Sequence, residues 1–155
     1  MVGYGKNEGI VPMACNEIFK RIKDNSDPDS SFEVQFSMLE IYNEKVQDLL
    51  LKNQNERPPG GLKVRENKGE VYVQGLSKHA VDSYTTIAKK MDEGYTSRSI
   101  GATQMNQTSS RAHTIITIEF KQVRMVEGRK MEKFSVINLV DLAGSEKSGQ
   151  TGAEG

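Results

Sequence analysis

The stretch of sequence that decides the fold is residues 134–146, with the sequence FSVINLVDLAGSE. Its first seven residues are mostly apolar, a pattern typical of a buried strand. Asp141 follows that strand directly, and a turn containing Gly144 comes next. Open α/β sheets bind their ligands at the carboxyl ends of strands. The sequence therefore predicts a ligand site where this strand ends.

A second polar cluster precedes another strand-like segment. Residues 106–113 have the sequence NQTSSRAH, and apolar and polar side chains alternate in residues 114–123 after them. The pair Glu127-Gly128 can turn this strand back into the one that ends at Val140. Long strands joined by a short turn are antiparallel neighbours. The two polar clusters therefore border strands that pair, which indicates a pair of phosphate-sensing loops.

The remaining patterns predict helices packed on a mixed sheet, an α/β fold that differs from a simple Rossmann alternation. The predicted elements are a glycine-rich loop over 1–9, a helix over 11–22 with Pro12 in its first turn, a strand over 32–38, a turn at 42–44, a hairpin over 62–73, a helix capped by Asp82-Ser83 that frays between Gly94 and Gly101, and a loop over 103–111.

Composition limits the possible functions. A chain of 155 residues is one domain or part of one, and 35% hydrophobic residues with a mean hydropathy of −0.59 is low for a self-contained α/β domain. The 21 basic and 21 acidic residues balance, so no global charge favours nucleic acid or an anionic membrane. The single cysteine, Cys15, excludes an internal disulfide and suits helix packing. No apolar segment approaches membrane-spanning length.

The residue types in the two clusters suit nucleotide hydrolysis. Phosphoryl transfer needs a phosphate cradle, Mg²⁺ and groups that respond to the γ-phosphate. Asp141 offers hard oxygen ligands for a metal or its water. Gly144 lets a backbone N–H approach a phosphate closely. Ser109 and Ser110 offer hydroxyl groups of the kind that bind phosphate or Mg²⁺.

The opposite charges of Arg111 and Glu146 could latch the two loops together. Each feature alone has an ordinary structural interpretation: Asp141 as a turn cap, residues 109–111 as a surface loop, and His113 as a hydrogen-bonded scaffold residue. Their joint occurrence beside pairing strands favours the functional interpretation.

Other chemistries lack their sequence patterns. Ser110, His113 and Asp141 are triad residue types, but no G-x-S-x-G elbow is present. Two histidines and one cysteine give no zinc-ligand spacing. The phosphate-binding motif G-x-x-x-x-G-K-[ST] does not occur in the 155 residues either.

The sequence resembles a kinesin motor domain along essentially its whole length. Residues 106–113 resemble kinesin switch I and residues 141–146 resemble switch II. Residues 40–50 resemble a third stretch distinctive of the family, and residues 9–12 resemble part of the helix that follows the kinesin P-loop. The resemblance implies a partial P-loop NTPase-type fold, a mixed sheet flanked by helices.

Residues 62–66 and 72–78 look most like the kinesin-3 subfamily. One departure is Ala112, where kinesins usually carry serine. The resemblance implies that this loss loosens the ordering of switch I, taken here as residues 103–113.

The resemblance also implies individual roles in ATP hydrolysis. The implied catalytic residues are Ser109, Ser110, Arg111 and Glu146, with an inter-switch ion pair between the last two. The implied nucleotide-binding residues are Asn106, Ser110 and Gly144, and the implied Mg²⁺ residues are Ser110, directly, and Asp141, through a bound water.

For the parent protein, the resemblance implies an ATP- and Mg²⁺-dependent motor that binds microtubules in the cytoplasm, with no nucleic-acid partner and no membrane insertion. A motor dimer would form through segments outside these residues, such as a coiled coil. We expect residues 1–155 to be the central part of one motor domain, without its P-loop and most of its microtubule interface, and inactive alone. The alternatives are a truncated, non-catalytic binding module and an incomplete gene model.

Overall fold

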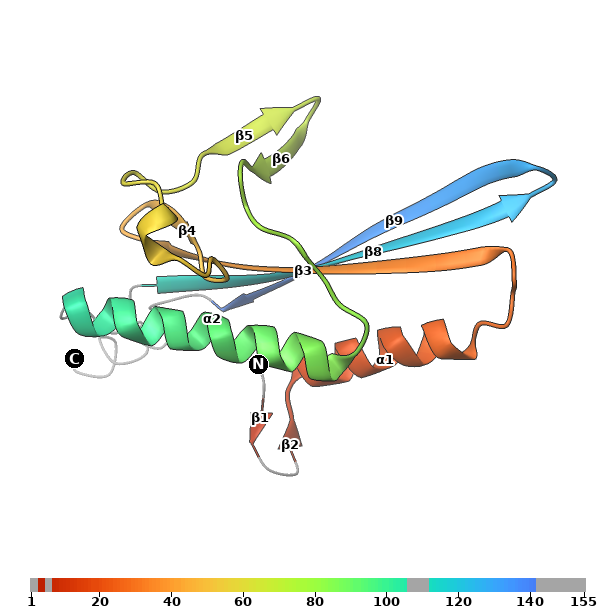
Figure 1. Ribbon diagram of the computed structural model, residues 1–155, viewed down its shortest axis with the longest axis horizontal. Helices are drawn as coiled ribbons and strands as arrows, with labels where there is room; N and C mark the ends of the chain where they lie inside the picture. The colour runs from red at the N-terminus through yellow and green to blue at the C-terminus, as the bar shows by residue number, and fades with distance from the viewer. Residues whose placement is uncertain (1–2, 5–6, 106–111, 142–155) are drawn as a thin grey trace, which may run out of the picture. The chain divides into compact units, whose positions relative to one another are not determined.

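A computed structural model describes residues 3–4, 7–105 and 112–141. These residues form two α-helices, one short 3-10 helix and nine strands (Figure 1). The elements are β1 (Gly3–Tyr4), β2 (Asn7–Glu8), α1 (Ile10–Asp24), β3 (Ser30–Tyr42), β4 (Lys45–Asp48), η1 (Gln54–Glu56), β5 (Val64–Asn67), β6 (Glu70–Val73), β7 (His79–Ala80), α2 (Tyr84–Met105), β8 (Ala112–Val126) and β9 (Arg129–Asp141).

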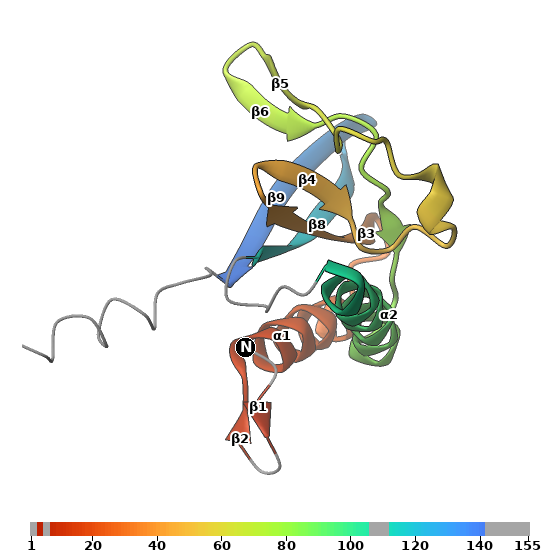
Figure 2. The ribbon, with the colours of Figure 1, turned by 90° about the vertical axis from the view of Figure 1, so that its left-hand side faces the viewer.

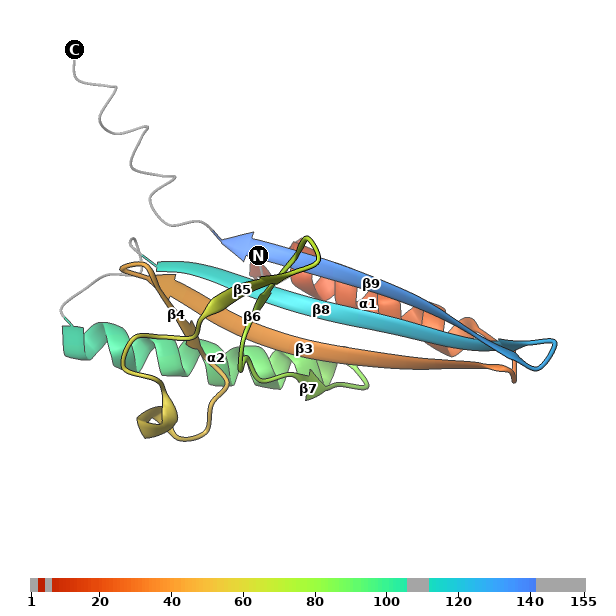
Figure 3. The ribbon, with the colours of Figure 1, turned by 90° about the horizontal axis from the view of Figure 1, so that it is seen from above.

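The main sheet has the strand order β4-β3-β8-β9, and β7 also pairs with β3. The strands β3, β8 and β9 run side by side (Figure 3). Glu127 and Gly128 join β8 to β9 with φ angles of 52° and 73°, as a two-residue hairpin turn requires. Two further hairpins, β1–β2 and β5–β6, form separate two-stranded sheets. The predicted mixed sheet with helices is therefore confirmed.

The prediction for the second helix is wrong at its end. The helix α2 continues through Gly94 and Gly101 to Met105, where the sequence had indicated fraying and a loop from residue 103. Gly94 is buried against Met38 and Leu50, and a Cβ atom there would overlap the Met38 sulfur. This glycine thus serves close packing of the helix and does not end it.

The contacts divide the chain into two compact units. The first unit comprises Met1–Ser37, Lys78–Met91 and Thr117–Leu139. The second unit comprises Met38–Ser77, Asp92–Ile116 and Val140–Gly155.

In the first unit, α1 and the initial turns of α2 lie on the same side of β3 and β8 (Figure 2). Ser83 caps α2, because its Oγ accepts a hydrogen bond from the Thr86 N–H at 3.3 Å. Burial raises the pKa of the Cys15 thiol to about 11, which suits a packing residue. The fully buried side chains of this unit's core are Val11, Cys15, Phe36, Ile87 and Ile118.

The outer face of β9 departs from the prediction of a buried strand. Phe134 and Val136 are 62% and 46% exposed. Asn138 lies on the same face by strand alternation, and its Oδ1 accepts a hydrogen bond of 2.8 Å from the Thr117 hydroxyl. The prediction is wrong for the described residues because β9 ends the strand order and the helices of this unit cover the other face.

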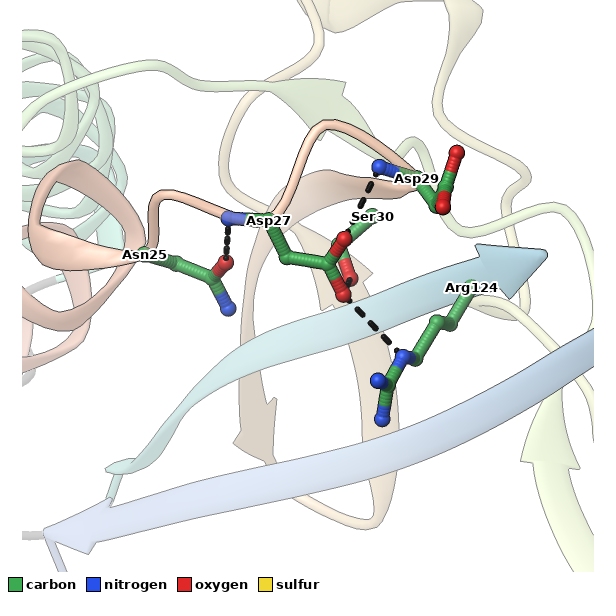
Figure 4. Close-up of polar contacts among 5 residues, drawn as sticks. All are labelled: Asn25, Asp27, Asp29, Ser30 and Arg124. Atoms are coloured by element: carbon green, nitrogen blue, oxygen red, sulfur yellow. Dashed lines mark hydrogen bonds and ion pairs between the residues drawn. The ribbon is translucent and has the colours of Figure 1, made fainter. Parts of the chain in front are cut away.

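Asp27 organises the connection between α1 and β3 (Figure 4). Its backbone N–H donates to Asn25 Oδ1 at 2.9 Å, and its carboxylate accepts hydrogen bonds from the Asp29 N–H at 3.0 Å and the Ser30 hydroxyl at 3.1 Å. Arg124 Nε lies 3.0 Å from the same carboxylate. The hydrogen bond from Asp29 is the main cause that lowers the pKa of Asp27. The turn is thus pinned to β8.

In the second unit, a buried carboxylate holds together the two ends of residues 49–77, the long connection after β4 that is called the excursion below. Asp48 is 1% exposed. Its two oxygens accept hydrogen bonds from the backbone N–H groups of Leu50, at 2.9 Å, and Ser77, at 2.7 Å. The excursion therefore begins and ends on one side chain, and the predicted hairpin β5–β6 lies within it.

Candidate functional site

The predicted site lies at one end of the β8–β9 ladder. The strand β8 begins at the buried Ala112, and β9 ends at the exposed Asp141. Because the two strands form a hairpin, the start of one and the end of the other lie at the same end of the sheet. The structure thus brings together the borders of the two polar clusters, as the sequence predicted.

Most of the predicted site residues lie outside the described residues. Asn106, Ser109, Ser110 and Arg111 fall in residues 106–111. Gly144 and Glu146 fall in residues 142–155. Their roles in catalysis, nucleotide binding and metal binding therefore stay predictions. Asp141 is the one predicted site residue among the described residues, and His113 lies half-buried on β8.

Arg98 ties α2 to the start of β8. Its Nη1 donates a hydrogen bond of 2.9 Å to the hydroxyl of Thr114. Thr114 is fully buried, so this charged donor reaches into the core of the second unit. Charge-assisted hydrogen bonds of this kind are among the stronger ones in proteins. The second half of α2 is thereby fixed to the strand that follows residues 106–111.

The charges of Asp141 and Arg98 both act on Tyr95. Burial is the main cause that raises the pKa of Tyr95, and the negative charge of Asp141 raises it further. The positive charge of Arg98 opposes both. Tyr95 therefore lies within electrostatic range of both Asp141 and Arg98.

Glu40 places a second carboxylate in this part of the unit. Burial raises the pKa of Glu40, and the charges of Arg98 and Arg57 act in the opposite direction. Sequence reasoning missed Glu40, Arg57, Tyr95 and Arg98 as parts of the site's surroundings. A carboxylate inside the apolar run of β3 was the one available signal, because a charge is seldom buried without a partner.

The described residues fit a limited metal role. Among them, no group of three or more His, Cys, Asp and Glu side chains could hold a metal ion. Asp141 supplies one exposed carboxylate. A single carboxylate suits Mg²⁺, which keeps several of its waters and is usually held by one or two carboxylates together with phosphate oxygens. The chemistry of this single donor therefore fits a carboxylate that holds a metal-bound water.

No helix in the described part of the chain has the length and apolar character needed to cross a membrane.

Comparison with known proteins gives consistent matches. The family model for the kinesin motor domain matches residues 1–155. Kinesin-related protein 1 of Dictyostelium discoideum is 47% identical over 161 residues, which cover 100% of this chain and 7% of that protein. The kinesin-like protein KIF1B of Rattus norvegicus is 48% identical over 97% of this chain and 8% of its own length. The kinesin-like protein unc-104 of Caenorhabditis elegans is 48% identical over 95% of this chain and 9% of its own.

A solved structure is also similar. It is described as that of a fast kinesin, with implications for its ATPase mechanism and interactions with microtubules. The TM-score is 0.81 at 37% identity, over 100% of this chain and 42% of the solved one. KIF1B and unc-104 are kinesin-3 proteins, which confirms the subfamily resemblance. The chain spans less than a tenth of the length of these curated relatives.

Proposed function

The chain belongs to the kinesin motor domain family, and from this membership we propose that it is the central part of one motor domain, in a protein that hydrolyses ATP to move along microtubules. The observation that carries the proposal is the position of Asp141 at the end of β9, beside the start of β8. This is the edge at which an α/β sheet places its ligand.

In this proposal the chain's own residues sense the γ-phosphate. Asp141 orients a water of the metal, and Ser110 contributes a hydroxyl ligand. Bound Mg²⁺ would neutralise charge on the phosphates. Ser109 and Asn106 position the switch I loop, while the Gly144 N–H binds the γ-phosphate. Arg111 and Glu146, the remaining pair, join the two loops when ATP is bound.

Other residues of the described structure support this site. Arg98 holds α2 to β8 through Thr114, so the residues that lead into and out of 106–111 are anchored on both sides. Arg98 also lowers the pKa of Tyr95, which the charge of Asp141 raises. We place the protein on cytoplasmic microtubules, with tubulin as its partner and ATP and Mg²⁺ as its ligands.

The test is microtubule-stimulated ATP hydrolysis by the full-length native protein and its Asp141→Asn variant. The substitution keeps the size of the side chain and removes its charge, so we expect turnover to fall by about 10- to 100-fold, the usual cost of losing an outer-shell metal partner. Asp92→Asn, an exposed change on α2, is the matched control. Full turnover by Asp141→Asn would contradict the proposed role.

The 155 residues alone contain no G-x-x-x-x-G-K-[ST] sequence, and we propose that they do not hydrolyse ATP by themselves. Titration calorimetry of this chain with Mg-ATP should show no micromolar binding. Micromolar binding of Mg-ATP would contradict this part of the proposal. Co-sedimentation with microtubules that is insensitive to nucleotide would instead favour a non-catalytic binding module.

A further inference from the structure

Arg57 lies in the excursion after β4 and connects it to the middle of α2. Its Nη2 donates a hydrogen bond of 2.6 Å to the hydroxyl of Ser97, forty residues later in the sequence. Its Nη1 donates to Gln47 Oε1 of β4 at 3.1 Å. One guanidinium therefore joins a loop, a strand and a helix of the second unit.

The helix is held at two consecutive residues. Ser97 accepts from Arg57, and Arg98 donates to Thr114 at the start of β8. The positive charges of both guanidiniums also act on the carboxylate of Glu40. Burial raises the pKa of Glu40, and these two charges oppose that rise. The second half of α2 is thus fixed between the excursion on one side and β8 on the other.

One donor of the Arg57 guanidinium, Nε, is buried and finds no hydrogen-bond acceptor among the described residues. A buried donor without a partner costs free energy, so such groups call for an explanation. Despite this cost, the guanidinium holds Ser97 and Gln47 in a fixed relative position, because its donors lie in a rigid planar fork.

We propose that Arg57 is a positioning residue for the nucleotide site. It holds the part of α2 that leads directly into residues 106–111, which lie within the predicted switch I, residues 103–113. By holding α2 in place, Arg57 would favour contact between the γ-phosphate and the residues proposed to sense it. The proposal deepens the function proposed above and rests on it.

The test compares Arg57→Ala with Arg65→Ala in the full-length native protein. Arg65 is a matched control, because it lies exposed on β5 of the same excursion and donates to Gln74 at 3.2 Å. We expect Arg57→Ala to lower kcat by about 10-fold, since small misplacements of catalytic groups are costly. The KM for ATP should change by about twofold or less, because the contact would act mainly on the transition state. Arg57→Lys should recover part of the loss, and Ser97→Ala should reproduce it.

Hydrogen exchange gives a second measurement that does not depend on activity. In Arg57→Ala, amides in the second half of α2 should exchange about 10-fold faster, while those of α1 keep their wild-type rates. Unchanged exchange in α2, or equal acceleration in α1 and α2, overturns the proposal. A wild-type protein that does not hydrolyse ATP would instead refute the proposed function, and α2 exchange would still decide whether Arg57 positions this helix.

Discussion

At the residue scale, Gly61 meets two separate requirements. Its φ of +79° lies in the left-handed region, and a Cβ atom there would lie 2.8 Å from the backbone oxygen of Val46. That oxygen accepts the 2.7 Å hydrogen bond from the Leu62 N–H that closes the excursion onto β4. Gly69 has a similar φ of +84°, but a Cβ atom there would meet nothing within 4 Å.

The two glycines therefore separate backbone strain from steric overlap. We expect Gly69→Ala to lower the free energy of unfolding by about 1 kcal/mol, the cost of a left-handed alanine. Gly61→Ala should cost about 2–4 kcal/mol, because overlap with the backbone adds to that strain. Urea unfolding of both variants measures the difference. Equal losses would show that the backbone at Val46 moves aside at little cost.

Glu40 gives the stability of the chain a defined dependence on pH. Its pKa is raised in the folded state, mainly by burial. Its contribution to stability is therefore complete below the pKa of an unfolded glutamate, about 4.3, and is lost as pH rises through the folded pKa. Glu40→Gln should thus be more stable than the wild type at pH 7, and this advantage should shrink towards pH 4.

The measurement is the free energy of unfolding of both proteins across that pH range. Glu33→Gln changes an exposed residue of the same strand and serves as the control. If Glu40→Gln is less stable than the wild type at pH 7, attraction by Arg57 and Arg98 outweighs the cost of burial.

At the scale of elements, Asp48 holds together the two ends of the excursion that carries β5 and β6. Asp48→Ala would leave the buried N–H group of Leu50 and the part-buried N–H group of Ser77 without their acceptor. We expect a loss of about 2–4 kcal/mol in unfolding free energy, since each unsatisfied group costs about 1–3 kcal/mol. Asp48→Asn keeps one carbonyl acceptor and should lose less. Hydrogen exchange at residue 77 reports the broken contact directly.

The elements with strong local patterns were predictable from the sequence. The Ser83 cap fixed the start of α2, and alternation together with the Glu127-Gly128 turn indicated β8 and β9. The end of α2 was not predictable, because the role of Gly94 depends on Met38, which is far away in the sequence. Arg57, Arg98 and Glu40 were missed for the same reason: their contacts join separate elements and leave no periodic signal. Of the candidate site, the sequence indicated Asp141 and the edge where it lies.

At the scale of the whole molecule, net charge and the local exposure of apolar side chains have the same consequence. The net charge is zero, so electrostatic repulsion between copies is weak. The outer face of β9 presents Phe134 and Val136, and exposed apolar patches of this kind are common sites of association. An apolar strand that the sequence marks as buried is thus exposed within the described structure. Both properties favour association of the 155-residue chain with itself.

We therefore expect this chain to sediment faster as its concentration rises and to enhance the fluorescence of an apolar dye. Phe134→Thr with Val136→Thr should reduce both effects, because threonine keeps the preference for a strand and adds a hydroxyl. Met13→Thr removes a side chain that is 53% exposed on α1 and is the control for apolar area alone. A wild-type chain that stays monomeric across the micromolar range, without dye binding, would show that this face is too small to drive association. Equal relief by Met13→Thr would instead place the association outside β9.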